Sequence, residues 1–403
     1  MRRMLLVKLP EPKRETQKAC YMPPLGLWSI AHNFHKWAGT DVVVEDHHLS
    51  PTPITGKWDA IGLSVQFSMQ HGEYLRYEKM ARPHTPIILA GGFHSAAVDS
   101  PKGVTVIHGE GETGLLPMKY FSDIDYPEIT EKMMAPYWEK GFPHDLQSKT
   151  NRWMSVEFSR GCFRNCGFCG VRNFWGRTRY YSSDKISRNL RSLFEIGVKE
   201  LFLEDDNVAT EPTMLRWIIG QMRRYEFAWS TPNGIQAKSV KDALPYLEDS
   251  GCWRVSLPFE TGSPKTANLM HLGNKWMDFE EARGLVESLN GIGIKTCGFF
   301  IIGYPGESLE DMKLTLDYAN SLPLDQRNIY IATPYPGTPL YDLCVAKGYL
   351  AVKPPALYES LLYTKGLIKT PEFIPDDVER LKSEDREKAL KKIKKMFDEP
   401  VNV

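Results

Sequence analysis

The chain contains three cysteines within eight residues, Cys162, Cys166 and Cys169. They follow a short apolar run and share one loop with Gly161 and Gly167. Thiolates on so short a loop can bind one soft metal centre. The glycines allow the loop to fold tightly and to point backbone N–H groups at an anionic group. The spacing therefore predicts a metal centre that a single loop holds.

Two kinds of centre suit thiolate ligands, a structural zinc ion and an iron–sulfur cluster. Zinc takes four protein ligands, usually as two separated pairs, and no second pair of Cys or His follows at such a spacing. A four-iron cube needs only three cysteine ligands when its fourth iron stays open to a substrate or cofactor. We therefore predict a cluster with Cys162, Cys166 and Cys169 as its ligands. Zinc and redox-active thiols are the alternatives.

The other four cysteines are isolated and are expected to be small buried hydrophobic residues; they are Cys20, Cys252, Cys297 and Cys344. Seven cysteines in 403 residues are too few, and odd in number, for a secreted disulfide framework. The basic start of the chain is cut by Lys8 and Pro10 before it reaches the length of a signal peptide. We expect a cytoplasmic protein.

The composition is that of a globular protein of two to three domains, at about 150 residues each. Hydrophobic residues make up 42% and charged residues 25%, which excludes a disordered or fibrous chain. Fifty basic residues balance fifty acidic ones, so nothing favours nucleic acid as a partner. The longest apolar run, 297–303, is too short for a membrane span of roughly 20 residues.

Two blocks of alternating strand and helix patterns surround the cysteine loop, which indicates an α/β fold built on parallel sheets. The first block, 1–120, predicts a Rossmann-like sheet. Its expected elements are strands near 4–8, 41–45, 60–65, 87–90 and 104–107, and helices near 26–37 and 70–81. The segment 47–58 is too short and too rich in proline for a full crossover helix, so this domain is expected to be a shortened version of the fold.

The second block, 153–340, contains six apolar strands, too few for a closed eight-stranded barrel. We predict a partial (β/α)6 barrel with its active site at the carboxyl ends of the strands. These strands are expected near 154–158, 200–203, 228–231, 253–257, 295–302 and 328–331. Scattered prolines at 121–152 indicate an extended connector, and 341–403 is expected to be a helical extension that ends in a charged helix.

The spacing Cys-x-x-x-Cys-x-x-Cys, with Phe168 before the third cysteine, resembles the radical S-adenosylmethionine (SAM) enzymes. Further segments are similar to later parts of that family in the same order; they are 203–207, 232–237, 258–262, 298–307 and 333–340. The resemblance covers residues 154–340. It implies a 4Fe-4S cluster whose open iron binds the amine and carboxylate of SAM.

The same resemblance implies contacts to SAM. Phe168 would lie against the adenine. The candidates for the polar groups of SAM are Asp205, Asn233, Gln236, Glu260 and Thr261, with Gly303 as a further contact. Family members often carry Arg where Gln236 stands, so a carboxylate contact there departs from the pattern. For each polar residue the alternative is ordinary hydrogen bonding at a strand end.

Four segments of the first block, 23–26, 61–66, 89–96 and 107–112, resemble the cobalamin-binding-type domain that precedes many radical SAM cores. Ser64 and Gly91 are 27 residues apart, as in that family. The resemblance implies cobalamin contacts at Pro24, Leu25, Ser64, Gln66, Gly91, Gly92 and Glu110. The glycine pair would allow a nucleotide tail to approach the backbone closely.

Cobalamin modules with a histidine ligand carry Asp-x-His-x-x-Gly well before the serine loop, and no such motif occurs there. The segment 46–51 resembles it loosely, in the wrong place and with Pro51 for the glycine. We expect His48 to lie in a turn or at the surface. Cobalamin is therefore expected without a histidine lower ligand. A domain that keeps the fold but not the cofactor is the alternative.

The resemblance implies methyl transfer to an unactivated carbon, from which a 5′-deoxyadenosyl radical has abstracted hydrogen. One alternative is a radical SAM cyclase, rearranging or oxidising enzyme without methyl transfer. Another is a non-catalytic maturation protein that binds the cluster and SAM. A flavodoxin- or ferredoxin-type electron donor and an unknown organic substrate are the expected partners.

Overall fold

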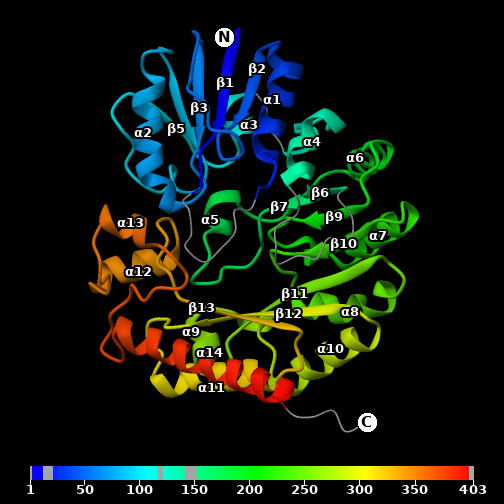
Figure 1. The fold of residues 1–403 in the computed structure, drawn as a ribbon, viewed down its shortest axis with the longest axis vertical. Helices are drawn as coiled ribbons and strands as arrows, with labels where there is room; N and C mark the ends of the chain where they lie inside the picture. Colours follow the sequence, from blue (N-terminus) through cyan, green and yellow to red (C-terminus); the bar gives the residue numbers. More distant parts are fainter. Residues whose placement is uncertain (1, 12–20, 117–120, 141–151, 399–403) are drawn as a thin grey trace.

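The computed structural model describes residues 2–11, 21–116, 121–140 and 152–398, the last few of these as backbone only. Two parallel sheets, of five and six strands, form an upper unit in blue and cyan and a lower unit in green to orange (Figure 1). Cys20 and part of the predicted connector, 141–151, lie outside the described residues. The two sheets confirm the predicted α/β fold.

The N-terminal sheet has the strand order β2-β1-β3-β4-β5, with every pair parallel. Its strands are β1 (Arg3–Lys8), β2 (Asp41–Asp46), β3 (Ala60–Ser64), β4 (Ile88–Gly91) and β5 (Val104–Ile107). Leu5 and Val7 pack on the side of α2 (His71–Ala81), whereas Met4 and Leu6 pack on the side of α1 (Leu25–Ala38). Burial on both faces explains why these strands read as continuous apolar runs.

The larger sheet has the order β13-β12-β11-β10-β9-β6 and is also parallel. Its strands are β6 (Trp153–Val156), β9 (Glu200–Leu203), β10 (Ala228–Thr231), β11 (Cys252–Glu260), β12 (Lys295–Ile302) and β13 (Gln326–Ile331). The helices between them are α6 (Ser183–Glu195), α7 (Pro212–Arg224), α8 (Ala237–Leu247), α9 (Pro264–Leu269), α10 (Phe279–Gly291) and α11 (Leu309–Ser321). Since β6 and β13 remain edges, the barrel is partial, as predicted.

The cysteine loop follows β6 and is closed at its base by a two-stranded antiparallel ribbon, β7 (Ser159–Arg160) with β8 (Arg179–Tyr180). Between these short strands lies α5 (Val171–Trp175), which sits between the two sheets in Figure 1. The ribbon therefore anchors both ends of the loop at the boundary of the two units.

The connector is not the extended chain that the sequence predicts. It contains a 3-10 turn, η2 (Phe121–Asp123), and a helix, α4 (Glu131–Lys140). Pro136 lies inside α4 and argues against a helix in the sequence, because proline lacks an N–H donor. Trp138 decides the outcome: it is buried, and its Nε1 donates to the Trp153 carbonyl at 2.7 Å. Tertiary packing thus outweighs local propensity here.

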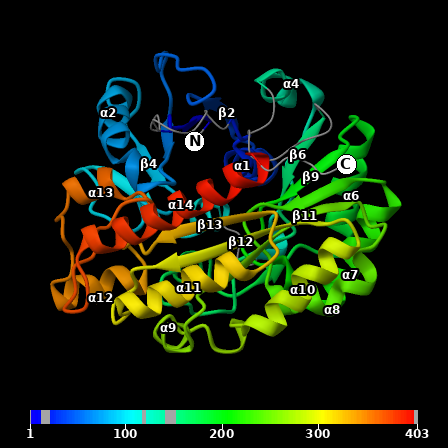
Figure 2. The same ribbon diagram turned by 60° about the horizontal axis from the view of Figure 1, so that its bottom comes forward.

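The C-terminal extension comprises α12 (Pro339–Lys347), α13 (Ala356–Ser360) and α14 (Pro375–Asp398), the charged helix that is expected at its end. In Figure 2, α14 runs along α11 and β13, and both neighbours contact it. None of the helices among the described residues is both long and apolar enough to span a bilayer.

Candidate cluster and cofactor site

A cavity of about 650 Å³ lies where the two sheets face each other. The N-terminal sheet lines it with residues at the ends of three strands, Ser64, Gly91 and Ile107. The barrel lines it with Glu157 and Asn233, which follow β6 and β10. Ligands of parallel α/β sheets bind at the carboxyl ends of the strands. A ligand held by either sheet would therefore face the other one.

The structure brings together four of the seven predicted cobalamin contacts, Ser64, Gln66, Gly91 and Gly92, along this cavity. The lining does not include Pro24, Leu25 or Glu110. Their chain neighbours take these places instead; they are Gly26, Leu27, Gly109 and Gly111. The cavity is thus lined by the loops that carry the predicted contacts, at four of the predicted positions and at neighbours of the other three.

The inner part of the cavity is an apolar slot between the N-terminal sheet and α1 with α3 (Gly111–Leu115). A methyl group on Gly62 would lie 2.6 Å from Leu6 Cδ2, and one on Gly111 would lie 2.3 Å from Ile30 Cδ1. The two glycines therefore allow Leu6 and Ile30, which line the cavity, to pack directly against the backbone of β3 and α3. Cavities of this size accept extended cofactors, and the residues present fit the nucleotide tail of a corrinoid.

His48 lies in the turn after β2, where its Nδ1 accepts a hydrogen bond from the Glu11 N–H at 3.0 Å. His47 beside it is buried and contacts Tyr77 and Glu45 through its two ring nitrogens. Neither histidine lines the cavity. The turn position of His48 is the one that the sequence analysis expects.

Backbone hydrogen bonds shape the cysteine loop. The Cys162 N–H donates to the Gly176 carbonyl at 3.2 Å, and the Gly167 N–H donates to the Met270 carbonyl at 2.8 Å. Gly161 has φ +84°, and a Cβ there would lie 2.7 Å from the Gly176 carbonyl oxygen. Only glycine fits this position, because both the backbone conformation and the space exclude a side chain.

Burial raises the pKa of the Cys166 thiol and raises that of Cys169 to about 12, so metal binding there must displace protons. A structural zinc site takes four protein ligands. Three thiols on one loop match the ligand count of a cube with one open iron.

Asp205 accepts hydrogen bonds from the backbone next to the cysteine loop. Its Oδ1 accepts hydrogen bonds from the N–H groups of Phe158 and Ser159 at 3.0 and 2.6 Å and from the Ser159 hydroxyl at 2.6 Å. Burial raises the pKa of Asp205 to about 8. The next residue, Asp206, accepts from the Gly161 N–H at 2.9 Å. This pair fixes the entry to the cysteine loop, which is the strand-end role considered as the alternative to SAM binding.

Asn233 lines the cavity and donates through Nδ2 to Glu204 Oε2 at 2.7 Å. The Ser155 hydroxyl donates to Glu204 Oε1 at 3.3 Å. Burial raises the pKa of Glu204 to about 7. A carboxyl group that titrates near neutrality therefore lies beside the cavity. Sequence reasoning missed it, although Glu204 opens the acidic turn that the resemblance includes.

Glu260 forms an ion pair with Lys275, whose Nζ lies 2.6 Å from Glu260 Oε1. Both side chains are mostly buried, and Lys275 Nζ lies 5.8 Å from the centre of the Phe168 ring. Burial alone would lower the pKa of Lys275, but the Glu260 carboxylate and the Cys166 thiol raise it. A permanent positive charge therefore lies beside the cysteine loop. Lys275 belongs to a short 3-10 turn, η4 (Gly273–Lys275), and no motif in the sequence marks it.

Three predicted SAM contacts remain, Thr261, Gln236 and Gly303. The Thr261 hydroxyl is hydrogen bonded to the Thr315 hydroxyl at 2.8 Å, and Gln236 directly precedes α8. A Cβ on Gly303 would lie 3.0 Å from Val378 of α14. Gly303 therefore allows the C-terminal helix to pack closely on the end of β12.

A partial barrel that carries a three-cysteine loop after its first strand, joined to a Rossmann-like domain, is the architecture that the sequence predicts for a radical SAM protein. Residues 156–319 match the family described as the Radical SAM superfamily. This match confirms the predicted resemblance to radical SAM proteins over that part of the chain.

Two curated relatives are methyltransferases. The cytidylyl-2-hydroxyethylphosphonate methyltransferase of Streptomyces wedmorensis is 29% identical over 260 residues, which are 62% of this chain and 47% of that protein. The bacteriochlorophyllide d C-12(1)-methyltransferase of Chlorobaculum tepidum is 23% identical over 359 residues, which are 83% of this chain and 77% of that protein. This chain thus spans about half the length of the first relative and most of the second.

A solved structure shares the whole architecture. The radical SAM methyltransferase TsrM of Kitasatospora setae, with cobalamin and a 4Fe-4S cluster bound, superposes with a TM-score of 0.67 at 16% identity. The match covers 88% of this chain and 79% of that one. At this identity the similarity establishes the fold, and it confirms the predicted order of a Rossmann-like domain and a partial barrel.

Proposed function

We propose that this protein is a cobalamin-dependent radical SAM enzyme that transfers a methyl group to an unactivated carbon of an organic substrate. The shared cavity carries this proposal. Glycine-rich strand ends of the N-terminal sheet and the first strand end of the barrel face the same space. Two cofactors that must exchange a methyl group would lie close to each other there.

The comparisons support the proposal. Two relatives are named methyltransferases, and TsrM, which has the same fold, was solved with cobalamin and a 4Fe-4S cluster. The relatives named here act on different compounds, so the substrate of this chain is proposed only as an organic molecule with an unactivated C–H bond.

We assign the ligands as follows. The cluster would be held by Cys162, Cys166 and Cys169, SAM by Phe168, Asn233, Glu260 and Lys275, and cobalamin by Ser64, Gln66, Gly91 and Gly92. When they are bound, these groups supply hydrogen-atom abstraction and methyl transfer. The other predicted residues would act by positioning the segments that bind the cofactors. The segments around SAM are positioned by Asp205, Gln236, Thr261 and Gly303, and those around the corrinoid by Pro24, Leu25 and Glu110.

The residues of the chain provide charge and exclude water. Lys275 offers a positive charge to the carboxylate of SAM, and Glu260 and Glu204 offer acceptors to its amine. Glu204 can hold a proton on its carboxyl group near neutral pH, since its pKa is raised to about 7. Apolar side chains such as Leu27, Ile107 and Phe174 line the cavity and keep water away from reactive groups.

We further propose a flavodoxin- or ferredoxin-type electron donor and a cytoplasmic location, where thiols stay reduced. The proposed organisation is a cobalamin-binding-type domain at 1–120, a connector at 121–152, a radical SAM barrel at 153–340 and a helical extension at 341–403.

The test is anaerobic reconstitution with iron and sulfide, followed by hydroxocobalamin and SAM that carries a deuterated methyl group. We expect absorption of both cluster and corrinoid, 5′-deoxyadenosine after reduction with dithionite, and deuterated methyl on the corrinoid by mass spectrometry. The Cys162→Ala variant should form no 5′-deoxyadenosine. Iron-free protein would overturn the proposal. Cleavage of SAM without corrinoid binding would instead support a radical enzyme without methyl transfer, and binding without cleavage would support a maturation protein.

A further inference from the structure

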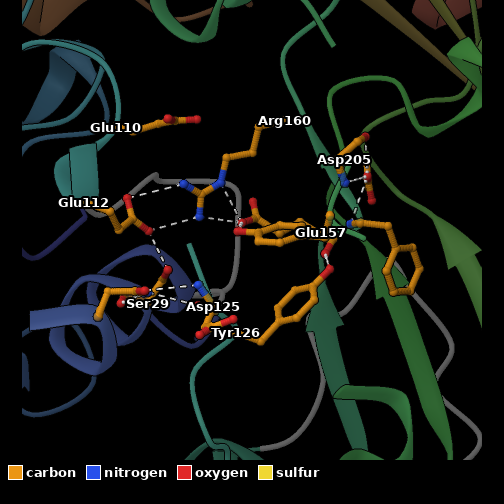
Figure 3. Close-up of polar contacts among 12 residues, drawn as sticks. Ser29, Glu110, Glu112, Asp125, Tyr126, Glu157, Arg160 and Asp205 are labelled. Atoms are coloured by element: carbon orange, nitrogen blue, oxygen red, sulfur yellow. Dashed lines mark hydrogen bonds and ion pairs between the residues drawn. The ribbon is translucent and has the colours of Figure 1, made fainter. Parts of the chain in front are cut away.

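Arg160 crosses the boundary between the two units (Figure 3). It belongs to β7 on the barrel side, two residues before Cys162, and its side chain is 5% exposed. Nη1 and Nη2 donate to the two carboxylate oxygens of Glu112 at 3.3 and 3.2 Å, and Nε donates to Glu157 Oε1 at 2.7 Å. One guanidinium group therefore joins α3 of the N-terminal domain to the start of the cysteine loop.

The contacts continue into the N-terminal domain. The Ser29 hydroxyl, on α1, donates to Glu112 Oε1, as Figure 3 shows. The helices α1 and α3 form the wall of the apolar slot, and Glu112, Arg160 and Glu157 all line the cavity. A chain of hydrogen bonds therefore follows the cavity wall from α1 to the cysteine loop.

Charge stabilises the contacts of Arg160 with Glu112 and Glu157. Burial alone would lower the pKa of Arg160, but Glu112 and Glu157 hold it well above its usual range. The rings of Trp175 and Tyr181 lie 5.6 and 5.8 Å from its guanidinium carbon and exclude other partners. A forked, bidentate Arg–carboxylate pair allows one relative orientation of its two partners. The position of α3 therefore determines the position of Arg160.

The loop side of the connection is equally constrained. The Gly161 N–H donates to Asp206 Oδ2 at 2.9 Å, and the Cys162 N–H donates to the Gly176 carbonyl at 3.2 Å. Few rotatable bonds separate Arg160 from Cys162. A displacement of Arg160 would therefore reach the cysteine directly.

We propose that Arg160 is a positioning residue that couples the N-terminal cavity to the cysteine loop. A ligand that fills the slot beside α1 and α3 immobilises Glu112, and Glu112 orders residues 159–169 through Arg160. The identity of that ligand, a corrinoid, rests on the proposed function. The coupling between Glu112 and the loop does not.

The first experiment uses the full chain without cofactors and measures hydrogen–deuterium exchange of amides in 159–169. Glu112→Gln leaves Arg160 paired with Glu157, so the fold should persist, while the charged fork is lost. We expect exchange in the loop to become about tenfold faster. Arg152→Gln is the matched control. It removes an exposed ion pair, Arg152 Nη1 to Glu131 Oε1 at 2.7 Å, near the same boundary, and should leave the loop unchanged.

The second experiment adds hydroxocobalamin to the same proteins. In the wild type, loop exchange should slow by about threefold or more, together with exchange in α1 and α3. In Glu112→Gln, the corrinoid should slow exchange in α1 and α3 but not in the loop. Equal protection of the loop in both proteins would overturn the coupling. If hydroxocobalamin fails to bind the wild type, the proposed function fails, whereas the first experiment still decides the positioning role.

Two further variants keep the proposal falsifiable if Glu112→Gln does not fold. Ser29→Ala removes one hydroxyl group from Glu112 and should speed loop exchange by about twofold to threefold. Arg160→Lys keeps the charge but lacks the planar fork, and should give exchange between the wild type and Glu112→Gln. Wild-type exchange rates in both variants would refute the role of Arg160.

Discussion

The barrel mouth and the slot of the N-terminal domain face one cavity but are made of different groups. At the barrel mouth, Asp205 is buried, and Glu204 and Asp206 are half-buried. Desolvation raises the pKa values of Glu204, Asp205 and Asp206 to about 7, 8 and 6. The slot is lined by glycines and aliphatic side chains, with Glu112 at its rim. Charges fix a small polar ligand at one point, whereas shape and apolar area hold a large one. The two regions should therefore respond differently to substitution.

The cysteine loop lies at the charged barrel mouth, and its substitution should have the largest effect on activity. Cys162→Ala removes one of three cluster ligands, so bound iron should fall sharply and 5′-deoxyadenosine formation should drop by more than about 100-fold. Iron analysis and absorption after anaerobic reconstitution measure the first quantity, and chromatography measures the second. Cys252→Ala is the control, because Cys252 is the first residue of β11, at the opposite end of that nine-residue strand from Glu260. Full iron content in Cys162→Ala would contradict the assignment.

Lys275 tests whether charge, rather than packing, selects the ligand at the barrel mouth. Lys275→Gln leaves Glu260 buried without its cation, so SAM should bind about 10- to 100-fold more weakly, or about 1.4 to 3 kcal/mol. Equilibrium binding of SAM to the reconstituted protein measures this change. Lys265→Gln, which removes an exposed lysine that pairs with Asp311, should leave SAM affinity unchanged. Unchanged affinity in Lys275→Gln, with lower stability alone, would assign Lys275 a structural role.

The fold is predictable from the sequence because its signals are local. Continuous apolar runs separated by helical patterns place β5 and β12 at the bounds that the structure shows. The helix α4 is the exception. Pro136 argues against it locally, whereas Met134, Tyr137 and Trp138 bury one side of the helix, and Trp138 also donates to the Trp153 carbonyl. Local patterns therefore predict elements well until tertiary contacts override them.

The site is less predictable, because most of its polar contacts join distant segments. Three cysteines on one loop reveal a metal centre directly. Lys275 reaches Glu260 from a turn without a motif, and Arg160 reaches Glu112 across 48 residues of sequence. Asp205 Oδ1 accepts from the backbone N–H groups of Phe158 and Ser159, a contact across more than 40 residues that no spacing in the sequence indicates. Spacing identifies residues on one loop, whereas partners across the fold depend on packing.

A substitution at Gly92 tests the apolar cavity wall of the N-terminal domain. A Cβ there would lie 2.5 Å from the Val65 carbonyl oxygen, and the φ of +111° is unfavourable for any side chain. Gly92→Ala should therefore destabilise the protein by about 1 to 3 kcal/mol and weaken hydroxocobalamin binding by about tenfold, while SAM affinity stays unchanged. Urea unfolding and corrinoid absorption measure both. Gly284→Ala on α10, where nothing lies within 4 Å, should be neutral or stabilising. Loss of SAM affinity in Gly92→Ala would show that the two regions are not separable.

The smallest effect is expected at Glu204, whose substitution should change the free energy of unfolding by an amount that depends on pH. Burial raises the pKa of Glu204 from 4.5 to about 7, so between these values the folded protein binds more protons than the unfolded chain. Its contribution to the free energy of unfolding therefore falls as pH rises through this window and is constant above it. Glu204→Gln mimics the protonated form and keeps groups for the bonds to Ser155 and Asn233. We expect it to stabilise the protein by about 1 kcal/mol at pH 8 relative to the wild type, and by less at pH 5.

Urea unfolding at the two pH values measures this difference. Glu287→Gln is the control, because Glu287 is exposed and pairs with Arg283 on the surface of α10. Its effect should be the same at both pH values. If Glu204→Gln instead destabilises the protein more at pH 8 than at pH 5, the carboxylate is stabilised in its ionised form. The barrel mouth would then hold Glu204 as a charged acceptor for the amine of SAM rather than as a group that carries a proton near neutrality.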